Sequence, residues 1–219
     1  MIQAILSDMD GVMLDSEKLY VRFWCEAARF YGYPMKTCHA LGIRSLGRPF
    51  AVAKLQGWFG ANFDYDLVRD KRVELMDAYV AAHGMEAKPG AEQLLQWLKT
   101  NGYRTALATA TPVERAARYL EQTELLPYFD VICSARQVPH GKPAPDIYLY
   151  AAAQLGVPPE NCMALEDSPN GVRSAVAAGC QTVLVPDLDN PSADLQGLPF
   201  TVADGLEDVI RLLREKTVA

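Results

Sequence analysis

Short apolar runs alternate with helical patterns along most of this chain, and this alternation restricts the fold more than any other feature. Each run is short and rich in apolar or β-branched residues, which is the pattern of strands covered on both faces. Strands and helices in alternation predict βαβ units with right-handed crossovers and a parallel sheet. The expected strands are residues 2–7, 103–109, 130–133, 162–165 and 181–185, with 200–202 as a sixth candidate.

Residues that favour helix starts and ends mark several of the expected helices. The segment Thr-Pro-Val-Glu at 111–114 predicts a capping box, with Thr111 at the N-cap and the proline at the first helical position. Ser168 is expected to open a second helix in the same way, and Gly179 to close it. Two further helices are expected over 91–100 and 146–155. We therefore expect an α/β fold with a Rossmann-like core and helices on both faces of a parallel sheet.

The stretch that follows the first strand breaks the alternation, because it contains no convincing strand. Amphipathic helices are predicted over 16–31 and 64–83, and a glycine follows the apolar pattern of each. Between them we expect one or two shorter helices with a glycine-punctuated loop at 42–49. The pattern therefore predicts an all-α insertion within an α/β core.

This insertion divides the chain into two expected domains. Residues 1–14 and 86–219 form the core, and residues 15–85 form the small helical domain. A structural side domain would explain such an insertion. It leaves directly after the first strand, however, and open α/β sheets bind ligands at the carboxyl ends of their strands. We therefore favour a cap that closes over a site there.

Composition narrows the classes of partner. The chain has 219 residues, half of them hydrophobic, which suffices to bury a sizeable core. Its net charge of −6 offers no basic surplus for nucleic acid, and no apolar run approaches the about 20 residues that cross a membrane. The spacing of its five cysteines fits neither a zinc site nor a redox pair. We expect a cytoplasmic monomer with reduced, mostly buried thiols and no nucleic-acid or membrane partner.

Polar side chains of a special kind follow four of the expected strands, at the point where each strand ends. They are Asp8 and Asp10 after the first, Thr109 and Thr111 after the second, Lys142 after the third, and Glu166 and Asp167 after the fourth. Because the carboxyl ends of parallel strands lie side by side, these four segments are expected to meet in one pocket. Singly, each residue also suits a turn, a helix start or an exposed loop. Their joint occurrence at strand ends favours a site.

The residue types in this pocket indicate phosphoryl chemistry. Four carboxylates repel one another unless a cation lies among them. Oxygen ligands without His or Cys favour a hard ion, so we expect Mg²⁺. A lysine and a hydroxyl beside that ion would hold a dianionic phosphoryl group. An aspartate can then act as a nucleophile, and a second acid two residues further on can act as general acid and base.

These motifs resemble those of the haloacid dehalogenase superfamily of phosphohydrolases, and the resemblance covers essentially the whole chain. It is carried by DMDGVMLD at 8–15, ALATAT at 106–111, HGKPAPDIY at 140–148 and LEDSPNGV at 165–172. The helical insertion is similar to the C1-type cap of one branch. That branch holds β-phosphoglucomutase, pseudouridine-5′-phosphatase and many sugar-phosphate phosphatases.

The resemblance implies a role for each matching residue. Asp8 would be the nucleophile and a metal ligand, and Asp10 would be the acid–base and bind metal through its main-chain carbonyl. Asp167 would complete the Mg²⁺ site, with Glu166 as a direct or water-mediated ligand. The phosphoryl oxygens would be held by Thr109, Lys142 and main-chain amides near Met9 and Ala110.

Within the superfamily, the residues favour a phosphatase. True haloacid dehalogenases and phosphonoacetaldehyde hydrolases lack the second aspartate of the first motif, whereas Asp10 is present here. β-Phosphoglucomutases typically carry a histidine twelve residues after the nucleophile, where this chain has Tyr20. We expect hydrolysis of a small phosphorylated metabolite, a sugar phosphate or a nucleoside 5′-phosphate, through an aspartyl-phosphate. The alternatives are a β-phosphoglucomutase-type mutase and, less favoured, a non-catalytic phosphate-binding protein.

Substrate specificity is expected to lie in the cap. Arg44 and Arg48 flank its glycine-punctuated loop and are candidates to reach a second anionic group on the substrate. Two solvated surface arginines are the alternative. The other candidate substrate-binding residues are Ser16 and Tyr20 from the first cap helix, and Ala110 and Thr111 beside the second motif.

Overall fold

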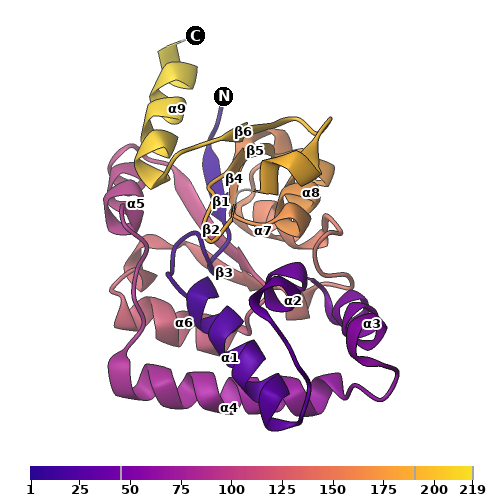
Figure 1. Ribbon diagram of the computed structural model, residues 1–219. Coiled ribbons are helices and arrows are strands. Elements are labelled where there is room, and N and C mark those ends of the chain that lie inside the picture. Colours follow the sequence, from indigo (N-terminus) through magenta and orange to yellow (C-terminus); the bar gives the residue numbers. More distant parts are fainter. Residues whose placement is uncertain (45, 190, 219) are drawn as a thin grey trace.

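The six expected strands form one parallel sheet in the computed structural model, which describes residues 1–44, 46–189 and 191–218 (Figure 1). The strand order is β3-β2-β1-β4-β5-β6. The strands are β1 (Ala4–Ser7), β2 (Arg104–Thr109), β3 (Val131–Ser134), β4 (Cys162–Glu166), β5 (Gln181–Leu184) and β6 (Phe200–Val202). The predicted α/β class is therefore confirmed.

The central position of β1 brings the three motif-bearing strands together. Ser7 at its carboxyl end is paired with Leu107 of β2 on one side and with Leu165 of β4 on the other. The chain continues in register for one more residue, because the backbone N–H of Asp8 donates to the carbonyl of Leu165 at 2.9 Å. The loops after β1, β2 and β4 therefore begin side by side.

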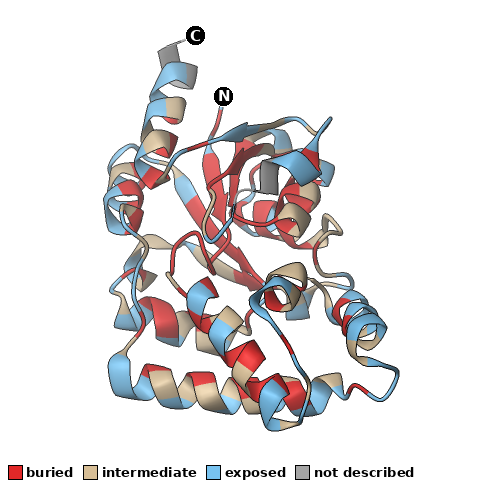
Figure 2. Cartoon of the chain, in the orientation of Figure 1, coloured by how far each residue is buried: buried red, intermediate tan, exposed pale blue. Residues whose placement is uncertain are grey.

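Helices cover both faces of the sheet (Figure 1). The core helices are α5 (Ala91–Thr100), α6 (Val113–Gln122), α7 (Asp146–Leu155), α8 (Pro169–Ala177) and α9 (Leu206–Val218). Ile5, Leu107 and Met163 form an apolar cluster with side chains of α5, α6 and α9, and Ala4 and Leu6 form another with α7 and α8. Figure 2 shows the sheet as the most deeply buried layer. Short 3₁₀ turns lie at Leu126–Tyr128, Ala135–Gln137, Pro159–Asn161 and Pro191–Leu195.

The stretch after β1 is helical, as predicted. It contains α1 (Glu17–Phe30), α2 (Thr37–Gly42), α3 (Arg48–Phe59) and α4 (Tyr65–His83). These helices lie together at the end of the molecule away from both termini (Figure 1). They share their own apolar cluster, which includes Trp24, Leu55 and Val68. Trp58 of α3 lies beside His39 of α2, with the ring centres 5.0 Å apart, and 40% of it is exposed.

Two sets of polar contacts tie these helices to the sheet domain. Near α3, the N–H of Gly47 donates to the carbonyl of Lys142 at 3.2 Å. Near α4, Asp77 accepts hydrogen bonds from Arg115, Arg118 and Tyr119 of α6. The helical segment therefore contacts the core on two sides of the strand ends.

One predicted helix boundary is wrong. α6 begins at Val113 with Pro112 as its N-cap, and no side chain caps it. The Thr111 hydroxyl donates instead to Asp10 at 3.1 Å, so it is not available to the helix end. Ser168 does cap α8 as predicted, because its hydroxyl accepts from the N–H of Gly171 at 3.0 Å.

The cysteines match the expectation of free thiols. All five are unpaired, and Cys38 alone is exposed. Among the described residues, no helix combines the length and the apolar character needed to cross a bilayer.

Candidate active site

The loop after β1 carries two buried carboxylates with different partners. Asp8 Oδ1 accepts a hydrogen bond from Lys142 Nζ at 2.6 Å. Asp10 is held by two hydroxyls, since Oδ1 accepts from Ser16 at 2.6 Å and Oδ2 accepts from Thr111 at 3.1 Å. Burial raises the pKa of Asp8 to about 7, and the pKa of Asp10 is also raised by burial. The two acids therefore face one site in distinct environments.

Lys142 is the buried cation of this site. Its Nζ lies 2.6 Å from Asp8 Oδ1, 2.6 Å from Glu166 Oε1 and 3.1 Å from the carbonyl oxygen of Ala108. Burial acts to lower the pKa of Lys142, but the two carboxylates outweigh it and raise the pKa above its usual range. The ammonium group is therefore charged and fixed beside Asp8.

Asp8, Glu166 and Asp167 form a cluster of carboxylates. One oxygen from each lies within 4.8 Å of the others, and all three residues are buried. Burial raises the pKa of Asp167 well above its usual range. Both Asp167 side-chain oxygens are buried without a hydrogen-bond partner among the described residues.

Such a carboxylate is costly without a counter-charge. The nearest cation is Arg44, whose Nη1 lies 3.5 Å from Asp167 Oδ2. An oxygen-only donor set with unused acceptors fits a hard cation such as Mg²⁺. The residues present therefore fit the ion that the sequence predicts.

Glu166 differs from Asp167 because donors already surround it. Its Oε1 accepts from Tyr148 at 2.5 Å and lies 2.6 Å from Lys142 Nζ, and its Oε2 accepts from Ser168 at 3.4 Å. These contacts hold the carboxylate still. Glu166 is therefore well placed to orient Lys142.

Two glycines make room for these acids. At Gly171, a Cβ atom would lie 1.9 Å from Glu166 Oε2. At Gly11, where φ is +82°, a Cβ atom would lie 2.4 Å from Asp167 Oδ2. Any side chain at either position would displace a carboxylate of the site.

The Gly171→Ala variant is expected to lose roughly 1–3 kcal/mol of stability, because the new methyl group overlaps a buried carboxylate that cannot move freely. Gly57 in α3 provides a matched control, since a Cβ there has nothing within 4 Å. Gly57→Ala is expected to gain about 0.5–1 kcal/mol from helix propensity. Thermal unfolding followed by circular dichroism measures both. Equal shifts in the two variants would contradict the packing described for Gly171.

A cavity of about 500 Å³ opens onto this cluster from between the helical segment and the sheet. Seven of the expected site residues line it: Asp8, Asp10, Tyr20, Arg44, Arg48, Ala110 and Thr111. The other five, Ser16, Thr109, Lys142, Glu166 and Asp167, are buried beside it. Thr109 is linked to the lining, because its hydroxyl oxygen accepts from the N–H of Thr111 at 3.0 Å. The structure thus brings all the expected residues to one end of the sheet.

Both arginines that were expected to reach the substrate are paired with carboxylates. Arg44 is buried and lies 2.7 Å from Asp189 as well as close to Asp167. Arg48 is exposed and forms an ion pair with Asp66. Arg44 is therefore engaged at the acidic cluster, whereas Arg48 lies at the cavity rim.

Sequence reasoning missed two charged residues of the cavity. Glu17, at the start of α1, is buried, and burial raises its pKa to about 8. Arg72 of α4 is only 7% exposed, and burial lowers its pKa. Its guanidinium lies 4.9 Å from the centre of the Tyr20 ring. The sequence did carry one sign that Arg72 is buried. It falls four residues from both Val68 and Met76, on the apolar stripe of its helix.

A family model described as haloacid dehalogenase-like hydrolase matches residues 2–179. That span includes all four polar strand ends. The chain belongs to the haloacid dehalogenase-like hydrolases. The resemblance inferred from the motifs is therefore confirmed.

Relatives of this hydrolase point to phosphatases. It is 30% identical to the phosphorylated carbohydrates phosphatase of Thermotoga maritima, over 98% of this chain and 99% of the relative. It is 35% identical to hexitol phosphatase A of Escherichia coli K12, over 84% and 82% of the two chains. The crystal structure of CbbY from Rhodobacter sphaeroides in complex with phosphate matches with a TM-score of 0.76 and 27% identity, covering 94% and 95%. The hydrolase is thus a phosphomonoester hydrolase by family, as expected.

Proposed function

We propose that this hydrolase is a Mg²⁺-dependent phosphatase that cleaves small sugar phosphates or nucleoside 5′-phosphates through an aspartyl-phosphate on Asp8. One observation carries the proposal. The Asp8 carboxylate lies beside both the Lys142 ammonium and the Asp167 carboxylate, at the end of a cavity that admits a small molecule. A nucleophile, a fixed positive charge and a cation site are thus within reach of one phosphoryl group.

The proposed metal ligands are Asp8, Asp167 and the main-chain carbonyl of Asp10, with Glu166 as a direct or water-mediated ligand. The Asp167 oxygens support this assignment, because they accept no hydrogen bond from the described residues. A bound Mg²⁺ would supply positive charge to the phosphoryl oxygens and keep the neighbouring Asp8 carboxylate ionised.

In the first proposed step, an Asp8 oxygen attacks phosphorus. A bond forms between that oxygen and phosphorus, and the bond from phosphorus to the ester oxygen breaks. Asp10 gives its proton to the departing alcohol, for which its burial-raised pKa suits it. Lys142 and the Thr109 hydroxyl hold the phosphoryl oxygens during the transfer.

In the second proposed step, water attacks the phosphorus of the aspartyl-phosphate. Asp10, now ionised, accepts a proton from that water, and the Asp8 carboxylate leaves. The products are the alcohol and inorganic phosphate, and both aspartates regain their starting states. The hydrogen bonds from Ser16 and Thr111 keep Asp10 aimed at the same point in both steps.

We further propose that residues 15–85 act as a cap over the core formed by residues 1–14 and 86–219. The cavity is lined from both parts, by Tyr20 and Arg72 on one side and by Asp8 on the other. Cap residues would then select the alcohol portion of the substrate. Tyr20 supports hydrolysis over the mutase reaction, because it stands where β-phosphoglucomutases typically carry a histidine. Its hydroxyl oxygen lies 3.2 Å from that of Thr111.

The test is release of inorganic phosphate from hexitol, hexose and nucleoside monophosphates, with Mg²⁺ and with chelator. We expect release that requires Mg²⁺. Conversion of β-glucose 1-phosphate into glucose 6-phosphate without phosphate release would favour the mutase instead. Absence of both reactions across the panel would contradict the proposed function.

A further inference from the structure

Arg44 reaches from the helical segment into the acidic cluster of the core. It follows α2, and its side chain is only 3% exposed. Its Nη2 donates to the main-chain carbonyl of Asp167 at 3.3 Å and to the Asp189 carboxylate at 2.7 Å. Its own main-chain carbonyl accepts from the Asn170 side chain at 3.2 Å. One residue of the helical segment is thus held by three residues of the core.

The ion pair between Arg44 and Asp167 is close but contains no hydrogen bond between the two side chains. Arg44 Nη1 lies 3.5 Å from Asp167 Oδ2. Neither this nitrogen nor either Asp167 side-chain oxygen has a hydrogen-bond partner among the described residues, and all three atoms are buried. The guanidinium charge therefore acts on the Asp167 carboxylate without using its acceptors. Those acceptors stay available to a cation.

The charge of Arg44 opposes a second cation at the same carboxylate. A fixed positive charge favours an ionised neighbour but repels another positive charge that binds there. Asp189 offsets part of the Arg44 charge, but the Asp189 side chain is 45% exposed, and water screens such a pair. The remaining charge is felt at Asp167. It should therefore weaken the binding of a cation to this carboxylate.

The contacts of Arg44 also help to hold the helical segment against the core. Beside them, the N–H of Gly47 donates to the main-chain carbonyl of Lys142 at 3.2 Å. A cation that binds Asp167 reduces the attraction of this carboxylate for Arg44. Because coupling between two binding events is reciprocal, the cation loosens the Arg44 contact to the same extent as that contact weakens the cation.

We propose that Arg44 couples the contact between cap and core to the binding of Mg²⁺. Arg44 lowers the affinity of Asp167 for Mg²⁺, and Mg²⁺ in turn loosens the contacts of Arg44 and Gly47 with the core. The inference rests on the proposed function, because it takes Asp167 as a Mg²⁺ ligand. It gives Arg44 a positioning role at the metal site in place of the substrate contact expected from the sequence.

The first test is the dissociation constant of Mg²⁺, measured on the whole chain by isothermal titration calorimetry. Arg44→Met removes the charge and keeps a long side chain, so we expect it to bind Mg²⁺ about tenfold more tightly than the wild type does. Arg44→Lys keeps the charge and should stay within about threefold of the wild type. Arg22→Met is the matched control and should leave the dissociation constant unchanged, because Arg22 is an exposed residue of α1 that pairs with Glu26 of the same helix. Circular dichroism checks that each variant is folded.

The second test uses the wild type alone and does not depend on the folding of a variant. The measurement is exchange of the Gly47 amide proton with deuterium, followed by NMR with and without Mg²⁺. We expect Mg²⁺ to speed this exchange by about threefold or more, because the hydrogen bond to Lys142 opens more often once Arg44 is held less tightly. The amide of Leu6, within the buried strand β1, should exchange no faster in Mg²⁺.

Three results would overturn the proposal. One is binding of Mg²⁺ to Arg44→Met that is no tighter than to the wild type. Another is equal tightening in Arg44→Met and Arg44→Lys, which would exclude charge as the cause. The third is exchange of the Gly47 amide that Mg²⁺ slows or leaves unchanged. All three leave the phosphatase assignment and its metal site intact, whereas a wild type that binds no Mg²⁺ would remove the metal site and this proposal together.

Discussion

Asp8→Asn is expected to lower phosphate release by roughly 10³-fold or more, because the amide cannot attack phosphorus. Glu166, the other carboxylate in contact with Lys142, is already held by Tyr148 and Ser168 and does not replace the lost nucleophile. The measurement is steady-state phosphate release in saturating Mg²⁺, with the best ester of the panel.

The loss in Asp8→Asn must come from chemistry and not from unfolding. Asparagine has nearly the same shape, and Lys142 keeps its contact with Glu166, so we expect a folded protein with an unchanged circular dichroism spectrum. Asp130→Asn is a control with the same chemical change, since Asp130 lies just before β3, at the amino end of the sheet. It should leave the rate unchanged. Retention of more than about a tenth of wild-type activity in Asp8→Asn would contradict a nucleophilic role for Asp8.

The second large expected effect is stabilisation of the folded protein by Mg²⁺. A ligand at 100 times its dissociation constant stabilises the folded state by about 2.7 kcal/mol. For a chain of 219 residues we therefore expect Mg²⁺ to raise the Tm by about 5–10 °C over the value in chelator. Asp167→Asn should abolish this increase, because it removes a carboxylate whose oxygens accept no hydrogen bond from the described residues. Differential scanning fluorimetry with and without Mg²⁺ measures it.

In chelator, the difference in Tm between Asp167→Asn and the wild type should also depend on pH. Burial raises the pKa of Asp167 in the folded state, so the folded protein binds this proton more tightly than the unfolded chain does. Stability of the metal-free wild type should therefore fall as pH rises above the unfolded pKa of the group. Asparagine does not ionise, and the Tm of Asp167→Asn relative to wild type should rise with pH. For the Mg²⁺ experiment, an equal rise in Tm in the wild type and in Asp167→Asn would contradict the metal site assigned to Asp167.

The sheet and the meeting of the strand ends followed from sequence pattern. Short buried strands with helices between them leave few arrangements, and a parallel sheet gathers the residues after its strands at one edge. Asp8 and Lys142 are 134 positions apart in the sequence, yet their convergence needed only that topology. The all-α character of the stretch after β1 was equally predictable, because it lacks any strand pattern.

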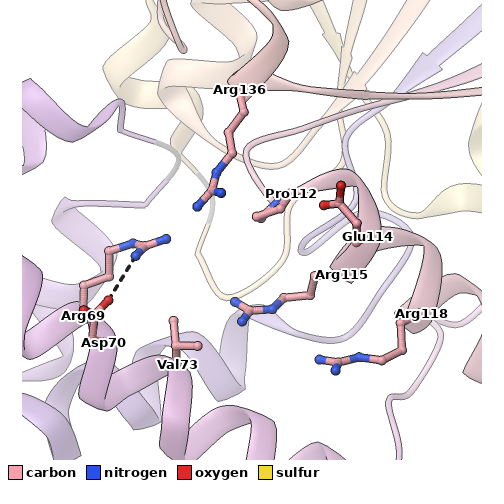
Figure 3. A pocket seen from close by; sticks show the side chains of 8 residues that line it. All are labelled: Arg69, Asp70, Val73, Pro112, Glu114, Arg115, Arg118 and Arg136. Atoms are coloured by element: carbon pink, nitrogen blue, oxygen red, sulfur yellow. Dashed lines mark hydrogen bonds and ion pairs between the residues drawn. The ribbon is translucent and has the colours of Figure 1, made fainter.

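Other features depend on packing that one segment does not reveal. Thr111 fits a capping sequence, but a tertiary contact with Asp10 takes its hydroxyl. The sequence placed the Asp10 carboxylate in one cluster with the other three acids. In the structure, the Ser16 and Thr111 hydroxyls donate to it and hold it apart from them. A second cavity, lined by Arg69, Arg115 and Arg136, forms where α4 and α6 lie beside the turn after β3 (Figure 3), and the positions of these arginines in the sequence gave no sign that they meet.

A covalent phosphoryl group on Asp8 is the most direct evidence for the proposed mechanism. The measurement is an acid quench within the first turnover in Mg²⁺, followed by intact mass and then peptide mapping by mass spectrometry. The account expects the wild type to gain the mass of one phosphoryl group, located on the peptide that contains Asp8, and expects Asp8→Asn to gain none. Phosphate release with no phosphorylated protein at any quench time, or a phosphoryl group on another residue, would contradict it.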